Sequence, residues 1–168
     1  MIRVLAGLAV LITLWPIAVA GHAMPNSTVV LTMERGGAQA QLVIPISELE
    51  AALRRDLSTM GQIVAAQPLL EAYLRTHVAL GASEGAPWAM SVARMAVGTD
   101  DHVSLEVTLR FSSPAPAQHL RLEYDAVSRE IASHYVLVYV RDREGLRALG
   151  RLQSPARNLV FARDHDAE

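Results

Sequence analysis

Histidine is the residue type in this chain whose side chain offers the most distinctive chemistry. The chain has six histidines and no cysteine, so no thiolate competes with imidazole for a metal ion. Neutral imidazole is a good ligand for nickel, copper, cobalt and zinc. We therefore expect any bound cofactor to be one of these transition metals. The six candidates are His22, His77, His102, His119, His134 and His165.

The sequence around each histidine favours a different role. His77 lies on the apolar side of a predicted helix, where a packed core histidine and a metal ligand are both open interpretations. His134 precedes an apolar strand and could cap it, pack against it or bind a metal. The remaining three are expected at the surface: His102 in a turn, His119 at the start of a strand and His165 in a polar tail.

Residues 1–23 are predicted to be a secretory signal peptide. Met1-Ile2-Arg3 provides a positive start, and residues 4–20 form an uncharged apolar run that is followed by small residues. The protein is therefore expected to be extracytoplasmic, and periplasmic in a bacterium. The alternative is a protein held in the inner membrane by residues 4–20, because such a run is close to the length of about 20 residues that spans a bilayer.

The cleavage position decides the role of His22. Cuts after Ala20, Gly21 or Ala23 all leave small residues at the positions that the peptidase requires. A cut after Gly21 makes His22 the first residue, whose α-amine and imidazole can chelate one metal together. A cut after Ala20 leaves His22 second, and a cut after Ala23 removes it.

Sequence signatures of catalysis are missing. The chain has no Gly-x-Ser-x-Gly elbow, no glycine-rich phosphate loop, no His-Glu-x-x-His and no paired-cysteine zinc spacing. We therefore expect no enzyme, no catalytic residues and no binding residues for an organic cofactor.

Length and composition favour one globular domain. Hydrophobic residues make up 51% of the 168 residues and charged residues 19%, a balance typical of a folded rather than a disordered chain. The domain is predicted over residues 24–162, with a polar tail over residues 163–168. The formal net charge of −2, without a basic stripe, excludes a nucleic-acid partner.

Alternation of apolar and polar residues with a period of two predicts a mainly β fold. Turns at residues 35–37 and 98–101 should each close a hairpin. The predicted strands cover residues 28–34, 38–46, 88–97, 103–111, 120–124 and 135–140, with one or two more within 146–161.

Two helices are expected between the hairpins. Ser47 and Glu50 have the spacing of a capping box, which predicts a first helix from this point. A second helix is predicted over residues 68–80, and residues 58–67 have no clear pattern. Together, the predicted strands and helices indicate an antiparallel β-sandwich of about seven strands with a helical insertion. The alternative is an α+β fold.

Several segments in order resemble the extracytoplasmic N-terminal region of HupE/UreJ-type membrane proteins, which are related to hydrogenase and urease accessory permeases. The resemblance implies recurring histidines at His22, His77 and His134 and a link to nickel or cobalt. The multi-helix membrane domain of that family is not within these 168 residues, so transport is not carried over. The segments are 22–27, 44–50, 73–77, 87–88, 124–127 and 133–142.

The sequence therefore predicts a noncatalytic exported accessory domain. It would bind a transition metal through His22, His77 and His134, or dock onto a polytopic membrane protein such as a transporter. The alternative is a purely structural protein–protein interaction module of the cell envelope.

Overall fold

A computed structural model describes residues 26–99 and 102–163. The predicted signal peptide lies outside the described residues, and so does all of the predicted tail except Arg163. In chain order the described elements are β1 Ser27–Glu34, β2 Gly37–Pro45, α1 Ile46–Leu53, α2 Met60–His77, β3 Val78–Ala82, β4 Ala89–Gly98, β5 Ser104–Ser112, β6 His119–Tyr124, β7 Tyr135–Arg141, β8 Leu146–Gln153 and β9 Asn158–Ala162.

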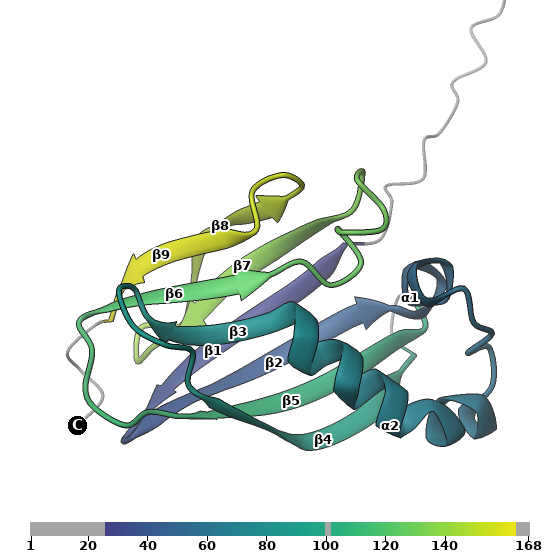
Figure 1. Ribbon diagram of the computed structural model, residues 1–168, viewed down its shortest axis with the longest axis horizontal. Coiled ribbons are helices and arrows are strands. Elements are labelled where there is room, and N and C mark those ends of the chain that lie inside the picture. The colour runs from purple at the N-terminus through teal and green to yellow at the C-terminus, as the bar shows by residue number, and fades with distance from the viewer. Residues whose placement is uncertain (1–25, 100–101, 164–168) are drawn as a thin grey trace, which may run out of the picture.

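The strands form two sheets (Figure 1). The larger sheet has six strands in the order β4-β5-β2-β1-β7-β8, and the smaller has three in the order β3-β6-β9. The prediction of a mainly β fold is confirmed. Both predicted hairpins are also confirmed as antiparallel pairs, β1 with β2 and β4 with β5.

The larger sheet is mixed, because β1 pairs with β7 in parallel. The register places Ser27 opposite Val136 and Thr32 opposite Arg141. The prediction of an antiparallel sandwich of about seven strands is therefore wrong in two respects: one central pair is parallel, and the described residues form nine strands. A parallel neighbour far along the chain leaves no local signal, since the side-chain period is two in either case.

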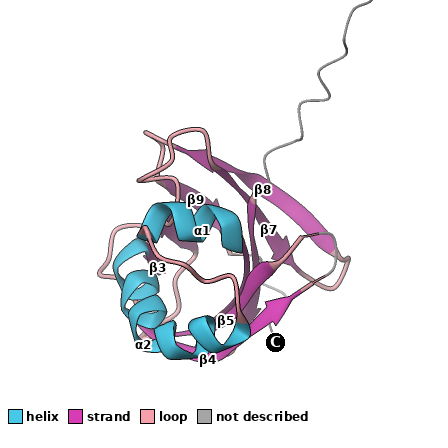
Figure 2. Ribbon diagram, turned by 90° about the vertical axis from the view of Figure 1, so that its right-hand side faces the viewer, coloured by secondary structure: helices cyan, strands magenta, loops and turns pink. Residues whose placement is uncertain are grey.

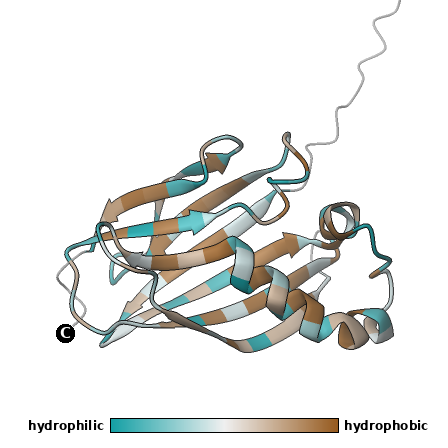
Figure 3. Cartoon of the chain, in the orientation of Figure 1, coloured by the Kyte–Doolittle hydropathy of each residue, from teal (hydrophilic) through white to brown (hydrophobic). Residues whose placement is uncertain are grey.

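One hydrophobic core lies between the sheets and the helices. Alternate residues of β1 and β2 point into it, such as Val29, Leu31 and Leu42, together with Leu122 of the smaller sheet and Leu70 of α2. Figure 2 shows α1 and α2 in front of the two strand layers, so the helices cover one end of the core. In Figure 3 brown shades alternate with pale ones along the strands, as expected when one face is buried.

The first helix does not begin with the predicted capping box. Pro45 is the N-cap of α1, and no side chain caps this end. The Ile46 amide instead donates to the carbonyl of Val103, 3.0 Å away and just before β5. Glu50 turns to the other end, where its Oε1 accepts from the Leu57 amide at 2.7 Å.

The second helix starts eight residues earlier than predicted and ends before the predicted limit. Thr59 and Gln62 form a capping box: the Thr59 hydroxyl accepts from the Gln62 amide at 3.3 Å, and Gln62 Oε1 accepts from the Thr59 amide at 2.8 Å. Pro68 lies inside this helix. Residues 78–80, predicted as its end, belong to β3, which pairs with β6.

Removing the Thr59 side chain that caps α2 should lower the stability of the fold. We expect Thr59→Ala to lower the free energy of unfolding by about 1 kcal/mol, because the Gln62 amide loses its acceptor. Thr76→Ala is the matched control, since the Thr76 hydroxyl donates to the Ala72 carbonyl within the same helix and caps neither of its ends. Urea unfolding measures both variants, and an equal loss in the two would contradict the assignment of the cap.

Candidate functional site

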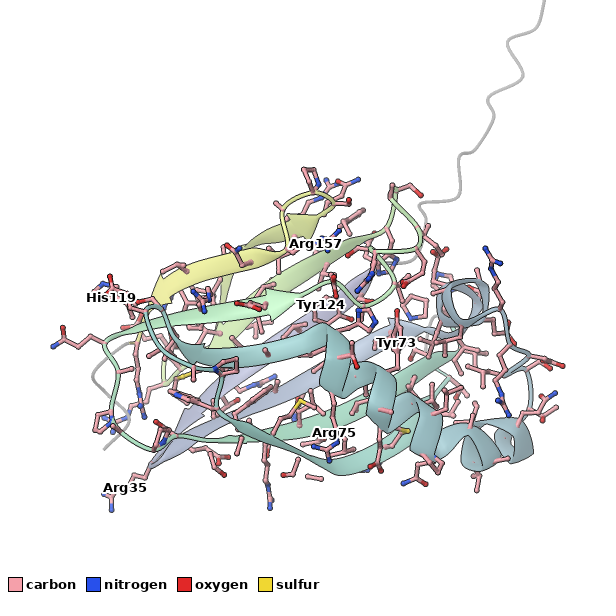
Figure 4. The ribbon with its side chains drawn as sticks, viewed as in Figure 1. Arg35, Tyr73, Arg75, His119, Tyr124 and Arg157 are labelled. Atoms are coloured by element: carbon pink, nitrogen blue, oxygen red, sulfur yellow. The ribbon has the colours of Figure 1, made fainter. Side chains whose placement is uncertain are left out.

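The structure places two of the predicted histidines in separate polar clusters, one at each end of the loop over residues 125–134. The His134 cluster consists of Ser27, Glu48, Tyr124 and His134. The His77 cluster consists of Tyr73, His77, Asp125 and Arg157. Figure 4 shows Tyr73, Tyr124 and Arg157, which reach this region from α2, from β6 and from the segment before β9.

The His134 cluster joins three elements that are far apart in the sequence. Ser27 Oγ, at the start of β1, lies 2.9 Å from His134 Nε2. The other ring nitrogen, Nδ1, lies 3.6 Å from Oε2 of Glu48 on α1. That separation is longer than a hydrogen bond, and both atoms lack a hydrogen-bond partner among the described residues.

Burial controls the protonation of this cluster. Ser27 is 0% exposed and His134 is 2% exposed. Burial lowers the pKa of His134 to about 4, so its imidazole is neutral at neutral pH. Burial also raises the pKa of Tyr124, whose hydroxyl has no hydrogen-bond partner among the described residues; the nearby Ser27 side chain acts more weakly in the opposite direction.

The contacts run from Ser27 through His134 to Glu48, which is the order of a nucleophile, a base and an orienting carboxylate in a catalytic triad. A substrate must, however, reach the serine hydroxyl, and the Ser27 side chain is closed off from solvent. The His134–Glu48 separation of 3.6 Å is also too long for the hydrogen bond that orients a catalytic base. This arrangement therefore offers a buried polar centre without access for a substrate.

The His77 cluster is held by a short charge-assisted contact. His77 Nδ1 lies 2.6 Å from Asp125 Oδ1, and Arg157 Nη1 lies 3.2 Å from the other oxygen of Asp125. The Tyr73 ring packs on the imidazole with centroids 4.3 Å apart. His77 is thus a packed histidine with a carboxylate partner on Nδ1, an arrangement that also orients metal-bound histidines.

The loop between the clusters is strained at Val127. This buried residue has a φ of 64°, a left-handed conformation that is uncommon for a β-branched side chain. Its amide donates to the Tyr73 hydroxyl at 2.8 Å, and that hydroxyl donates in turn to Glu130 Oε2 at 3.1 Å. Tyr73 therefore fastens the loop to α2 and offsets the strain.

The predicted histidine trio is not assembled within residues 26–99 and 102–163. No group of three His, Cys, Asp or Glu side chains that could hold a metal ion occurs in these ranges. His22 and His165 lie outside them, so their predicted roles remain predictions. His102 and His119 are exposed, in agreement with the surface roles expected for them.

Sequence reasoning missed the acidic partners of both histidines. The sequence pattern gives Glu48 no role beyond the start of a helix and gives Asp125 no role, because neither residue is near its histidine in the sequence. It also missed the first half of α2, where an outward apolar surface begins. The sequence signal that could have located the start of α2 is the pair Thr59 and Gln62, whose spacing fits a capping box.

No family model matches the sequence, and a search of the curated proteins finds no match. The resemblance to HupE/UreJ-type proteins thus remains a prediction. In the described part of the chain, no helix is both long and apolar enough to cross a membrane.

The half-buried Tyr73 and the buried Tyr124 should respond differently to loss of the hydroxyl. We expect Tyr73→Phe to lower the free energy of unfolding by about 1–3 kcal/mol, because the Val127 amide loses its acceptor. Tyr124→Phe should change it by less than about 1 kcal/mol at pH 7, because the Tyr124 hydroxyl has no hydrogen-bond partner among the described residues. Urea unfolding of both variants measures the difference, and equal losses would contradict the hydrogen-bond assignment.

Alkaline pH should destabilise the native protein through the same tyrosines. Burial raises the pKa of Tyr73 and Tyr124, so above about pH 10 the unfolded chain releases protons that the folded chain retains. The free energy of unfolding should then fall by about 1.4 kcal/mol per pH unit for the fully buried Tyr124, and by less for the half-buried Tyr73, which solvent screens. Tyr124→Phe should flatten this decline, whereas Tyr139→Phe, on the outer side of β7, is the control; identical slopes would contradict the prediction.

Proposed function

We propose that the chain is a noncatalytic exported accessory domain that docks onto a polytopic membrane protein. The observation that carries this proposal is an apolar surface on the outer side of α2. We call it the α2 face, and it consists of Val64, Ala65, Pro68, Leu69 and Ala72.

The α2 face lies opposite the side of the helix that packs on the core. Val64 is 62% exposed and Leu69 is 42% exposed. The inward side is apolar as well, with Ile63, Ala66, Leu70 and Leu74 buried. A surface helix of an isolated domain normally carries polar residues on its outer side. A helix with apolar residues on both sides is typical of one that has a second partner.

The shape and composition of this face fit an apolar protein surface. Its small residues, Ala65 and Ala72, allow close approach of another backbone, while Val64 and Leu69 provide side chains that can enter pockets. Charged groups are absent from these five positions, as in the centre of many interfaces. The partner surface is therefore expected to be apolar, which an extracytoplasmic part of a polytopic protein can provide.

The buried state of Ser27 supports the noncatalytic part of the proposal. Its hydroxyl bonds His134 but is shielded from solvent, so the cluster lacks the access that a hydrolase needs. The rival function, a purely structural module of the cell envelope, would use the same face on a protein that is not embedded in the membrane.

Position-specific crosslinking in intact cells tests the partner. A photoreactive benzoylphenylalanine at position 64 of the full-length exported chain should form an adduct with one integral membrane protein, which stays in the membrane after an alkaline wash. Adding Leu69→Asp should reduce that adduct about tenfold, because a charge would be buried in the interface.

Position 160 provides the matched control, because Val160 is exposed on β9 of the smaller sheet. We expect no specific adduct from it. An adduct from position 64 that remains soluble after the wash would favour the structural module. Equal adducts from both positions, or none from position 64, would overturn the docking proposal.

A further inference from the structure

We propose that Glu48 and His134 form a binding site for a divalent transition metal, with Glu48 Oε2 and His134 Nδ1 as its two protein ligands. This inference stands apart from docking through α2. It also differs from the predicted histidine trio, since it requires Glu48 and does not involve His77.

The separation of the two atoms fits a shared metal ion better than a direct bond. Ligands at about 2.1 Å from zinc, at a tetrahedral angle, lie about 3.4 Å apart. Glu48 Oε2 and His134 Nδ1 lie 3.6 Å apart, beyond hydrogen-bond distance. Both atoms are buried and have no hydrogen-bond partner among the described residues.

Unpartnered buried polar atoms are rare in folded proteins, because each loses its hydration without compensation. Here two such atoms, a ring nitrogen and a carboxylate oxygen, face each other in the core. A divalent cation between them would satisfy both. It would also compensate the charge of the Glu48 carboxylate, whose side chain is only 13% exposed.

The surroundings of the imidazole suit a metal ligand. Ser27 Oγ lies 2.9 Å from Nε2 and orients the ring, as hydrogen-bond partners of metal-bound histidines commonly do. Burial lowers the pKa of His134, which keeps the ring in the neutral form that binds metals. Of the two side chains, that of Glu48 is the more exposed, at 13% against 1% for His134.

The donor set indicates the class of metal. One imidazole and one carboxylate suit zinc, nickel, cobalt and copper better than magnesium or calcium, which prefer oxygen ligands alone. Two protein ligands leave coordination positions open, which water molecules can fill. The site would therefore be a weaker one than a closed structural zinc site with four protein ligands.

Titration of the purified mature protein with each metal salt alone tests the site. We expect one equivalent of zinc, nickel, cobalt or copper to bind, and magnesium not to bind. Glu48→Gln, which keeps the size of the side chain but removes its charge, should weaken binding at least about tenfold. His134→Gln should weaken it to the same extent.

The matched controls are His77→Gln and Asp125→Asn, which alter the other cluster and should bind metal as the unaltered protein does. Thermal unfolding with and without metal gives a second readout: the metal should raise the midpoint of the unaltered protein and of these controls, but not that of Glu48→Gln. Absence of binding, binding unchanged in Glu48→Gln, or loss of binding in His77→Gln would each overturn the proposal.

Discussion

The parallel pairing of β1 with β7 is the constraint on which the other features of this protein depend. It places the N-terminal strand at the centre of the larger sheet and joins β4, β5 and β2 to β7 and β8. The register opposite Val136 brings Ser27 to within hydrogen-bond distance of His134. Because β6 belongs to the other sheet, the chain must cross between layers over residues 125–134. That crossing sets the positions of both polar clusters and explains why Val127 is held in a strained conformation by Tyr73.

The two proposals arise from two places where the residue types differ from those typical of a stable isolated domain. The core is mostly aliphatic, yet it contains the imidazole of His134, and the partly buried carboxylate of Glu48 lies at its edge. The facing atoms of these two groups have no hydrogen-bond partner among the described residues. Replacing such groups with apolar residues would often stabilise a fold, so their presence favours a role in binding. The outer side of α2 shows the opposite difference: it carries apolar residues at exposed positions, where polar or charged residues are normal. Glu48 and this face belong to one helical insertion between β2 and β3, whereas His134 comes from the loop before β7.

Elements with strong local periodicity were predicted well. Alternation in residues 28–34 and 103–111 corresponds to β1 and β5, and both hairpins follow from turns that join consecutive strands. The short strand β3 was missed, because Val78–Ala82 contains small residues that also suit a helix end, and only pairing with β6 decides its conformation. The start of α2 was missed because Gly61 and Pro68 weaken the helical pattern there. Its capping box at Thr59 and Gln62 and its contact with the core outweigh that intrinsic preference.

The sequence by itself determined the inventory of chemistry, which includes six histidines, no cysteine and no catalytic signature. The export leader stays a prediction, because it lies outside the described residues. The sequence also determined the mainly β class, because residues that alternate in polarity bury one face of a strand wherever that strand lies. Only the tertiary structure decided which side chain contacts which histidine. Asp125 lies 48 residues from His77, and Ser27 lies 107 residues from His134. Such contacts follow from the order of strands in the sheets, which depends on long-range packing of the core and leaves no periodic signal in the residues themselves.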